Sequence, residues 1–370
     1  MELSTHTAAV LEGIGQSIIL KALPIPSPAP GSATVRVLAT TVSPNSRAVF
    51  AGKFGPVTIR TPVTPSGPAI ARIHNIGVDA TFLQPGQLVF TDLWTRSRDD
   101  PDESILAGYI GGNQKLEAAW EHGTFAEYAN VPLERIWPLN ESRVCKAMNY
   151  SSEELVHLGT ISIAIAGLMD INVLPTDTVI VAPATGTFSG AAVHAALAMG
   201  ASVIACGRNE EALAHITNTF ESSGCLSTVK LTGDAPGDTA AIKAITGKKG
   251  ADKYIDFIPP QAAGSEHITS CISALRPHGK AVFMGAVFSN LEIPYTLIMR
   301  HNLTVQGRYM FDYHHAEYAI KLLETGRLIL GDRPNSGLKI HTFKLQDIEK
   351  AIDAAATTCR GWGNSVVLKP

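Results

Sequence analysis

The segment that decides the fold runs from Val179 to Gly190 and reads VIVAPATGTFSG. It begins with apolar, mostly β-branched residues, which are typical of a strand buried on both faces of a sheet. Small residues follow, and an alanine-rich stretch continues to Met199 before Gly200, which predicts a helix over residues 189–199. A buried strand, a small-residue turn and a helix in this order predict the start of a βαβ unit.

The second half of the chain continues this alternation of strand and helix. The predicted strands cover residues 178–182, 202–206, 254–258, 280–284 and 303–310, and the predicted helices cover residues 153–169, 210–219 and 263–275. Ser151 or Ser152 can cap the first of these helices, with Glu154 in its first turn. We therefore expect an α/β fold that contains a Rossmann-type, doubly wound parallel sheet with helices on both faces.

The chain before about residue 140 has a different pattern. Short β-branched runs at residues 33–41, 69–76, 87–90 and 125–131 are separated by proline and glycine, which predicts a small, irregular β-barrel. After residue 311 we expect helices over residues 316–325 and 345–356 and a last strand over residues 365–369.

Composition excludes several functional classes. Hydrophobic residues make up 45% and charged residues 17% of the 370 residues, as in a well-packed protein of about two domains. The net charge of −3 and the lack of a basic cluster argue against nucleic-acid binding. The N-terminal residues lack the features of a signal peptide, and the most apolar run, residues 190–206, is shorter than the roughly 20 residues of a membrane helix. We expect a cytoplasmic protein with no membrane partner.

The turn after the first strand of the βαβ unit is a candidate dinucleotide site. Small residues let the backbone approach a pyrophosphate, and the helix N-terminus offers free N–H groups and a positive dipole. The glycine places of the Gly-x-Gly-x-x-Gly pattern fall on Ala184, Gly186 and Ser189, with Gly190 one position later. The match is partial, but the surrounding strands and helix supply the expected context. A βαβ unit that binds no nucleotide is the alternative.

The end of the second strand predicts which dinucleotide binds. Enzymes that use NAD place Asp or Glu there, against the ribose hydroxyls. In this chain Gly207, Arg208 and Asn209 occupy that place, and the first carboxylate is Glu210. A guanidinium can hold a 2′-phosphate through charge-assisted hydrogen bonds, so Arg208 predicts NADPH as the cofactor. Alternatively, Arg208 is a solvent-facing turn residue.

With these features in place, nearly the whole chain resembles the medium-chain dehydrogenase/reductase superfamily, and within it the zinc-free branch of quinone-oxidoreductase-like and enoyl-reductase-like proteins. The matching pieces are residues 42–46 (VSPNS), 76–79 (IGVD), 85–89 (PGQLV), 123–128 (GTFAEY), the nucleotide turn, 274–280 (ALRPHGK), 284–286 (MGA) and 366–370 (VVLKP). Their order and spacing together are specific.

The resemblance implies a chaperonin-10-like β-barrel domain, closed by the C-terminal segment, with the Rossmann-type domain inserted. The expected boundaries are residues 1–150 and 312–370 for the barrel-like substrate domain and 151–311 for the dinucleotide domain. Similar proteins bind a small-molecule substrate in a cleft between the domains and often dimerise through the strand that here runs from Leu303 to Met310. The expected cofactor-binding residues are Thr185, Gly186, Thr187, Phe188, Ser189, Gly207, Arg208, Asn209, Ile258, Gly285 and Ala286.

This chain departs from its zinc-dependent relatives at the catalytic metal site. Those enzymes use a Cys, a His-Glu pair and a further Cys or Asp as metal ligands. The corresponding positions here are Ser43, Gly67 with Pro68, and Gly159, none of which can bind zinc. His314 and His315 are adjacent in sequence, which is poor spacing for two ligands, and we expect both at the surface. We therefore predict no catalytic metal.

The resemblance implies reduction of an activated C=C bond or a quinone, and such a site needs a hydrogen-bond donor at the carbonyl oxygen. Some enoyl reductases keep a Tyr at a position that corresponds here to Phe54, which has no hydroxyl. The candidate catalytic residues are Asn45, on the turn that also contains Ser46, and Tyr109, in the long segment of residues 91–122. Asn45 can equally be a structural turn residue and Tyr109 a packing residue, with water as the proton source.

We favour a zinc-independent, NADPH-dependent oxidoreductase that transfers hydride to an enone, enal, enoyl thioester or quinone. One alternative is a carbonyl reductase or alcohol dehydrogenase that works without zinc. Another is a non-catalytic NADPH-binding protein.

Overall fold

The computed structural model describes residues 5–370, and the chain divides into two compact units. The first unit contains the chain up to Gly159, Lys339–Arg360 and Asn364–Pro370. The second contains Thr160–Leu338 and Gly361–Gly363.

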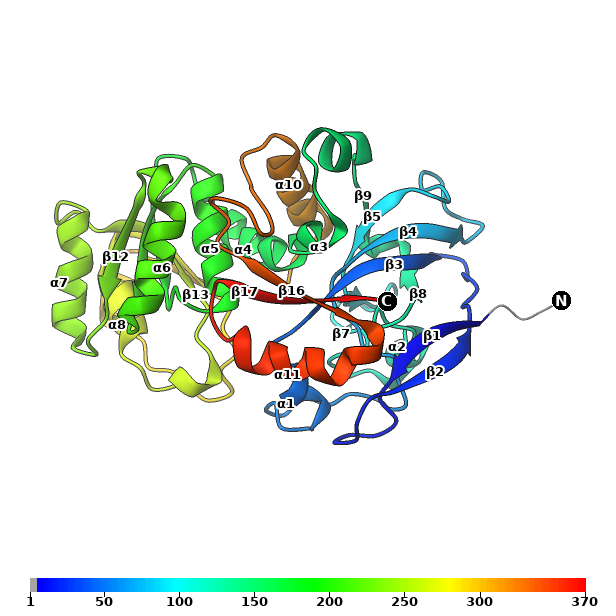
Figure 1. Cartoon of the computed structure of the whole chain (residues 1–370). Helices are drawn as coiled ribbons and strands as arrows, with labels where there is room; N and C mark the ends of the chain where they lie inside the picture. Colours follow the sequence, from blue (N-terminus) through cyan, green and yellow to red (C-terminus); the bar gives the residue numbers. More distant parts are fainter. Residues whose placement is uncertain (1–4) are drawn as a thin grey trace. The chain divides into compact units, whose positions relative to one another are not determined.

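The first unit is built around a seven-stranded sheet (Figure 1). Its strands are β3 (Ser32–Val42), β4 (Ala69–Ile76), β5 (Leu88–Thr91), β8 (Tyr128–Pro132), β9 (Ile136–Pro138), β16 (Lys339–Lys344) and β17 (Asn364–Lys369). The order is β16-β17-β3-β4-β5-β9, and β8 also pairs with β3. The C-terminal strand β17 therefore joins the N-terminal sheet, as the resemblance implied. Alternating residues of β3, β4, β5 and β8, including Val35, Ile73 and Val89, form an apolar core.

Smaller elements complete the first unit. They are the strand pairs β1 (Thr5–Val10) with β2 (Ile19–Pro24) and β6 (Trp94–Arg96) with β7 (Ser104–Leu106), and the helices α1 (Ser46–Phe50), α2 (Gln114–Ala119), α3 (Ser152–Leu155) and α11 (Ile348–Thr358). The expected helix over residues 153–169 is divided into α3 and α4 (Leu158–Asp170). Of the two serines expected as caps, Ser151 is the N-cap, and it forms a reciprocal capping box with Glu154.

The second unit contains a six-stranded parallel sheet in the order β12-β11-β10-β13-β14-β15 (Figure 1). These strands are β10 (Thr178–Ala182), β11 (Ser202–Gly207), β12 (Leu226–Lys230), β13 (Ala251–Asp256), β14 (Leu275–Phe283) and β15 (Thr304–Gly307). The helices are α5 (Thr187–Ala198), α6 (Glu210–Phe220), α7 (Ala235–Ile245), α8 (His267–Ser273), α9 (Tyr295–Arg300) and α10 (Tyr313–Glu324). The strand order reverses next to β10, so the sheet is doubly wound, and ligands of such sheets bind at the carboxyl ends of the strands beside the reversal.

Strand β12 and helices α7 and α9 of the second unit were not predicted from the sequence. Strand β12 is an edge strand in which only Val229 is buried, so it lacks the apolar run by which the other strands were recognised. Helix α7 begins with Pro236 and Gly237 in its first turn, and Asp234 caps it. Proline and glycine usually indicate a loop, but proline in the first turn is compatible with a helix.

The unit boundaries differ from the expected ones, because residues 151–159 belong to the first unit and residues 312–338 to the second. Helix α10 is held there by charged groups: Arg308 lies 3.5 Å from Asp170 and 2.5 Å from Asp312. The expectation that His315 is at the surface was wrong. Its ring is buried, and Nδ1 accepts a hydrogen bond of 2.9 Å from the Asp312 N–H, which caps the helix. His314 is exposed, as expected.

Within residues 5–370, no helix combines the length and the apolar character that crossing a membrane requires.

Candidate functional site

The predicted nucleotide turn contains an internal hydrogen bond to the buried hydroxyl of Ser189. Gly186 is the N-cap of α5, which begins at Thr187, two residues earlier than predicted. The Ser189 side chain is buried and its Oγ accepts a hydrogen bond of 2.9 Å from the Gly186 N–H. The Ser189 hydroxyl is therefore used inside the turn, and any contact of this residue with a phosphate would come from its backbone.

Two backbone hydrogen bonds hold the turn from outside. The Ala184 N–H donates to the Cys206 carbonyl at 2.7 Å, which ties the turn to the end of β11. The Trp362 N–H donates to the Thr185 carbonyl at 3.0 Å. Sequence reasoning missed Trp362, because nothing in its local sequence connects it with a turn about 180 residues earlier.

The expected residues Ile258, Gly285 and Ala286 come together beyond the carboxyl ends of β13 and β14. The Ala286 N–H donates to the Ile258 carbonyl at 3.0 Å. Gly285 lies so close to Ile258 that a Cβ at residue 285 would be 2.5 Å from Ile258 Cγ2. The Phe188 and Phe257 rings are nearly parallel, at 16° and with centroids 6.3 Å apart. Residues after β10, β13 and β14 therefore make pairwise contacts at the strand ends of the second unit, where ligands of doubly wound sheets bind.

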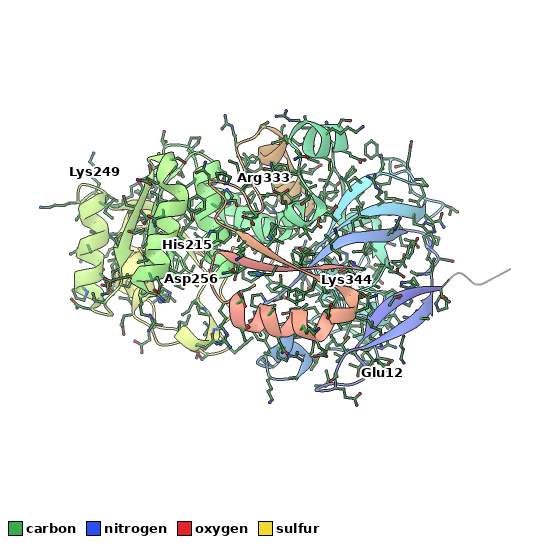
Figure 2. All side chains as sticks on the ribbon, viewed as in Figure 1. Glu12, His215, Lys249, Asp256, Arg333 and Lys344 are labelled. Atoms are coloured by element: carbon green, nitrogen blue, oxygen red, sulfur yellow. The ribbon has the colours of Figure 1, made fainter. Side chains whose placement is uncertain are left out.

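A buried carboxylate holds the backbone at the end of β13 in place. Asp256, labelled in Figure 2, is the last residue of β13. It accepts hydrogen bonds from the Tyr254 hydroxyl at 3.0 Å and the Ile258 N–H at 3.0 Å, and contacts His267 Nε2 at 3.1 Å. Burial, together with the neighbouring Asp256, raises the pKa of Tyr254 well above its ordinary value, so this hydroxyl stays protonated and donates. Sequence reasoning missed this group, because Asp256 lay in the middle of the predicted strand over residues 254–258 and not at its end.

The predicted ribose-binding residues lie at the end of β11. Asn209 caps α6, and its side-chain oxygen accepts a hydrogen bond of 3.0 Å from the Ala212 N–H, so this amide is already engaged. Arg208 is exposed, and no ion pair of its guanidinium is found within the described part of the chain. Gly207 brings this turn close to the nucleotide turn, since a Cβ at residue 207 would lie 3.2 Å from Thr185 Cγ2.

In the first unit, the positions that the resemblance assigns to zinc ligands, among them Gly67 and Gly159, are closely packed. A Cβ at Gly159 would be 2.5 Å from Pro68 Cβ, closer than real Cβ atoms approach their neighbours. A Cβ at Gly67 would collide with the Thr41 carbonyl oxygen. The residues present offer one hydroxyl, that of Ser43, and no thiolate, imidazole or carboxylate. They do not fit a zinc ion, and the described residues contain no cluster of three His, Cys, Asp or Glu side chains suited to a metal.

Buried polar groups surround these positions. The Thr124 hydroxyl donates to the Gly67 carbonyl at 2.8 Å and accepts from the Gly67 N–H at 2.9 Å. Asp92 Oδ2 would lie 3.6 Å from a Cβ at Gly159, and this oxygen has no hydrogen-bond partner within residues 5–370. Burial raises the pKa of Asp92 to about 6, against an opposing effect of Arg135. Sequence reasoning did not identify this carboxyl group.

The two candidate catalytic residues both contact Ser43. The Tyr109 hydroxyl donates to Ser43 Oγ at 3.0 Å, and the Tyr109 ring packs edge-on against Phe50. The Asn45 N–H donates to the same oxygen at 3.2 Å, while the Asn45 side chain makes no hydrogen bond to the N-terminus of α1. The structure thus brings Asn45 and Tyr109 to one hydroxyl, although they are 64 residues apart in the sequence.

Comparison with known proteins agrees with this architecture. The family model described as "Alcohol dehydrogenase GroES-like domain" matches residues 29–141. The model described as "Zinc-binding dehydrogenase" matches residues 189–325. The two matches together cover more than half of the chain, in the order in which the superfamily carries these domains. The chain belongs to the medium-chain dehydrogenase/reductase superfamily.

Relatives in this superfamily match nearly the full length of the chain. An NAD-dependent alcohol dehydrogenase from Sulfurisphaera tokodaii is 24% identical over 92% of this chain and 93% of its own. The crystal structure of a protein named AibC superposes with a TM-score of 0.80 at 17% identity, covering 100% of this chain and 97% of that one. A Sinorhizobium meliloti 1021 protein solved with NADP bound has a TM-score of 0.73 at 18% identity, covering 99% and 100%.

The superfamily therefore accounts for the fold: a GroES-like domain and a Rossmann-like domain, as predicted. The comparisons show the superfamily but not the predicted zinc-free branch. Solved structures of similar fold include a thermostable alcohol dehydrogenase with cobalt and zinc bound. Among these relatives, the names and bound cofactors include both NAD and NADP.

Proposed function

We propose that this protein is an NADPH-dependent oxidoreductase that works without zinc and transfers hydride to an activated C=C bond or a quinone. The observation that carries the proposal is the replacement of the metal-ligand positions by Ser43, Gly67 with Pro68, and Gly159, together with the close packing of Gly159 on Pro68. Without a Lewis acid, a plain ketone must be polarised by hydrogen bonds alone. A conjugated acceptor needs less polarisation, because its negative charge develops on an enolate or quinol oxygen.

When bound, the reduced nicotinamide supplies the hydride. In this chain the groups available to stabilise negative charge on the substrate oxygen are the Tyr109 hydroxyl and the Ser43 hydroxyl to which it donates. We expect Tyr109→Phe to lower kcat at least about tenfold while the Kd for NADPH is unchanged, because general acid and hydrogen-bond catalysis contribute factors of about 10²–10⁴. Asn45→Ala keeps the backbone N–H that donates to Ser43 Oγ, so it tests separately whether the Asn45 side chain contributes. An unchanged kcat in both variants would point to water as the proton source.

NADPH preference is the second part of the proposal. It is supported by the exposed Arg208 after β11 and by the absence of a carboxylate in the turn before Glu210. We expect the wild-type protein to be stabilised more by NADPH than by NADH in a thermal-shift titration. Arg208→Ala should weaken NADPH binding by about tenfold or more and leave NADH binding nearly unchanged. Arg327→Ala, at another exposed position of the second unit, is the matched control. Equal losses for both cofactors would contradict the assignment.

Reduction of a carbonyl group is the second candidate function, favoured by the relatives that are named alcohol dehydrogenases. Product analysis on an α,β-unsaturated ketone separates the two. A saturated ketone supports C=C reduction, and an allylic alcohol supports carbonyl reduction. Dialysis against a chelator should leave the rate unchanged in either case. NADPH binding without turnover over a panel of enones, quinones and ketones would instead indicate a non-catalytic protein.

We further propose a homodimer through the edge of the second unit's sheet. Strand β15, within the stretch from Leu303 to Met310, is at the end of the strand order and has one unpaired side. Exposed apolar side chains lie nearby in the sequence, including Tyr295 (74% exposed) and Met299 (58% exposed). An unpaired edge flanked by apolar side chains favours association. Light scattering should give twice the mass of the chain, and Val305→Pro should give the monomer.

A further inference from the structure

The strand register places a second cation beside the proposed ribose-binding turn. Strands β11 and β12 are parallel, and Gly207 is paired with Lys230. The Leu231 N–H donates to the Gly207 carbonyl at 2.8 Å, so the two strand ends are joined directly. Neighbouring strands lie about 4.8 Å apart, which brings Lys230 next to the residue that precedes Arg208.

Lys230 forms an ion pair with Glu210, the acidic residue that follows the proposed ribose-binding turn. Its Nζ lies 2.9 Å from Glu210 Oε1, and Glu210 is the first residue of α6. The two side chains are 53% and 71% exposed. An ion pair this exposed contributes little stability and exchanges partners readily. Helix α6 and strand β12 run side by side in Figure 1, which fits this contact.

The other polar group at this edge is already engaged. The Asn209 side chain caps α6 through the Ala212 N–H, so it is not available to an incoming anion. Two cations and one anion therefore lie at the end of β11. Arg208 directly follows the strand, Lys230 is paired with Gly207 by the strand register, and Glu210 forms the ion pair with Lys230. A dianionic group bound here would attract both cations and be repelled by Glu210.

We propose that Lys230 is a specificity-determining residue that binds the 2′-phosphate of NADPH together with Arg208, and that Glu210 is its partner when no phosphate is present. This inference rests on the proposed binding of NADPH at the end of β11. A phosphate monoester carries about −1.5 to −2 charges at neutral pH, so it competes with the single charge of Glu210 for Lys230. The 2′-hydroxyl of NADH carries no charge, and Lys230 then keeps its pair with Glu210.

The same geometry allows an opposite role for Glu210. Its carboxylate could accept a hydrogen bond from the ribose hydroxyls, as acidic residues do in NAD-binding proteins. In that case Glu210→Gln would weaken NADH binding. The proposed role predicts instead that Glu210→Gln tightens NADPH binding, because repulsion is removed and Lys230 is released. One variant therefore distinguishes the two roles.

The test measures binding of adenosine 2′,5′-bisphosphate and of AMP by calorimetry, which separates the phosphate contact from the nicotinamide and from turnover. We expect Lys230→Met to weaken binding of the bisphosphate about three- to tenfold and to leave binding of AMP unchanged. Glu210→Gln should tighten binding of the bisphosphate by a similar factor. Both effects should shrink as salt is raised from 50 to 500 mM, because exposed charges are screened. Lys249→Met is the control, since Lys249 is an exposed lysine after α7 (Figure 2).

Arg208→Ala, measured in parallel, tells the two possible failures apart. If Arg208→Ala weakens binding of the bisphosphate more than binding of AMP but Lys230→Met does not, the role of Lys230 is overturned and the NADPH assignment stands. If neither variant distinguishes the bisphosphate from AMP, the NADPH assignment fails and this inference with it. Weaker AMP and NADH binding by Glu210→Gln would overturn the proposed role of Glu210.

Discussion

Gly190 lies directly against the side chain of Trp362, and a Cβ at residue 190 would be only 2.5 Å from the Trp362 Cγ atom. Both residues belong to the second unit, and Trp362 also donates its backbone N–H to the nucleotide turn at Thr185. In dinucleotide folds the last glycine of the fingerprint lets the helix pack closely on a strand. Here Gly190 makes room for an indole from the C-terminal part of the chain.

Replacing Gly190 with alanine should therefore strain this contact. We expect Gly190→Ala to lower the free energy of unfolding by about 1–3 kcal/mol, the range for an overfilled core. Urea unfolding measures this change. In the double variant Gly190→Ala with Trp362→Ala the two losses should not add, because the smaller side chain removes the collision. Additive losses would show that the two residues are not in contact.

The Ser189 hydroxyl should contribute to both stability and cofactor binding. Ser189→Ala removes the hydrogen bond to the Gly186 N–H and should cost about 1 kcal/mol. It should also raise the Kd for NADPH, because the turn becomes less well defined. Ser151→Ala is a matched control, since Ser151 caps α3 in the first unit. That control should lose similar stability without any change in NADPH affinity. Equal Kd values for both variants would argue against a role of the turn in binding.

Restoring the ligands of zinc-dependent relatives should not restore a zinc site. In the variant Ser43→Cys with Gly67→His and Gly159→Cys, the new side chains at residues 67 and 159 collide with Thr41 and Pro68. We expect less than stoichiometric zinc after dialysis, measured by atomic absorption, and a lower melting temperature. Gly159→Ala alone should already lower the free energy of unfolding by about 1–3 kcal/mol. One tightly bound zinc per chain in a stably folded triple variant would contradict this view of the packing.

Acid should destabilise the protein partly through His194. Burial lowers the pKa of His194 from 6.5 to about 4, and its ring contacts Phe220 and Trp362. Above pH 6.5 the ring is neutral in both states and has no effect. As the pH falls from 6.5 to 4 the unfolded chain takes up a proton that the folded chain does not, so stability decreases by about 3 kcal/mol.

The variant His194→Leu isolates this effect. Its unfolding free energy should fall less steeply between pH 6.5 and pH 4 than that of the wild type. His278→Asn is the control, because His278 is exposed and has a positive φ of 63°, which asparagine tolerates. The control should keep the wild-type slope. If His194→Leu also keeps it, the histidine titrates normally in the folded protein.

Local sequence patterns predicted much of the second unit. The run from Val179 to Gly190 predicted a strand, a turn and a helix, and these are β10 and α5. The serines at residues 151 and 152 predicted an N-cap for α3, and Ser151 provides it. Such features depend on residues a few positions apart, through periodic burial and capping, so a single sequence reveals them. The same patterns did not reveal β12, in which only Val229 is buried.

By itself, then, the sequence determined that the chain alternates strand and helix after about residue 150 and that an arginine follows the second strand. It also determined that the positions which the resemblance assigns to zinc ligands carry Ser43, Gly67 with Pro68, and Gly159. Only the tertiary structure decided that Lys230 lies beside Gly207, that Trp362 covers Gly190, and that Tyr109 meets Ser43. Each of these pairs joins residues more than 20 positions apart. Strand register and side-chain packing set such contacts, and both depend on how the whole chain buries its apolar surface rather than on any local pattern.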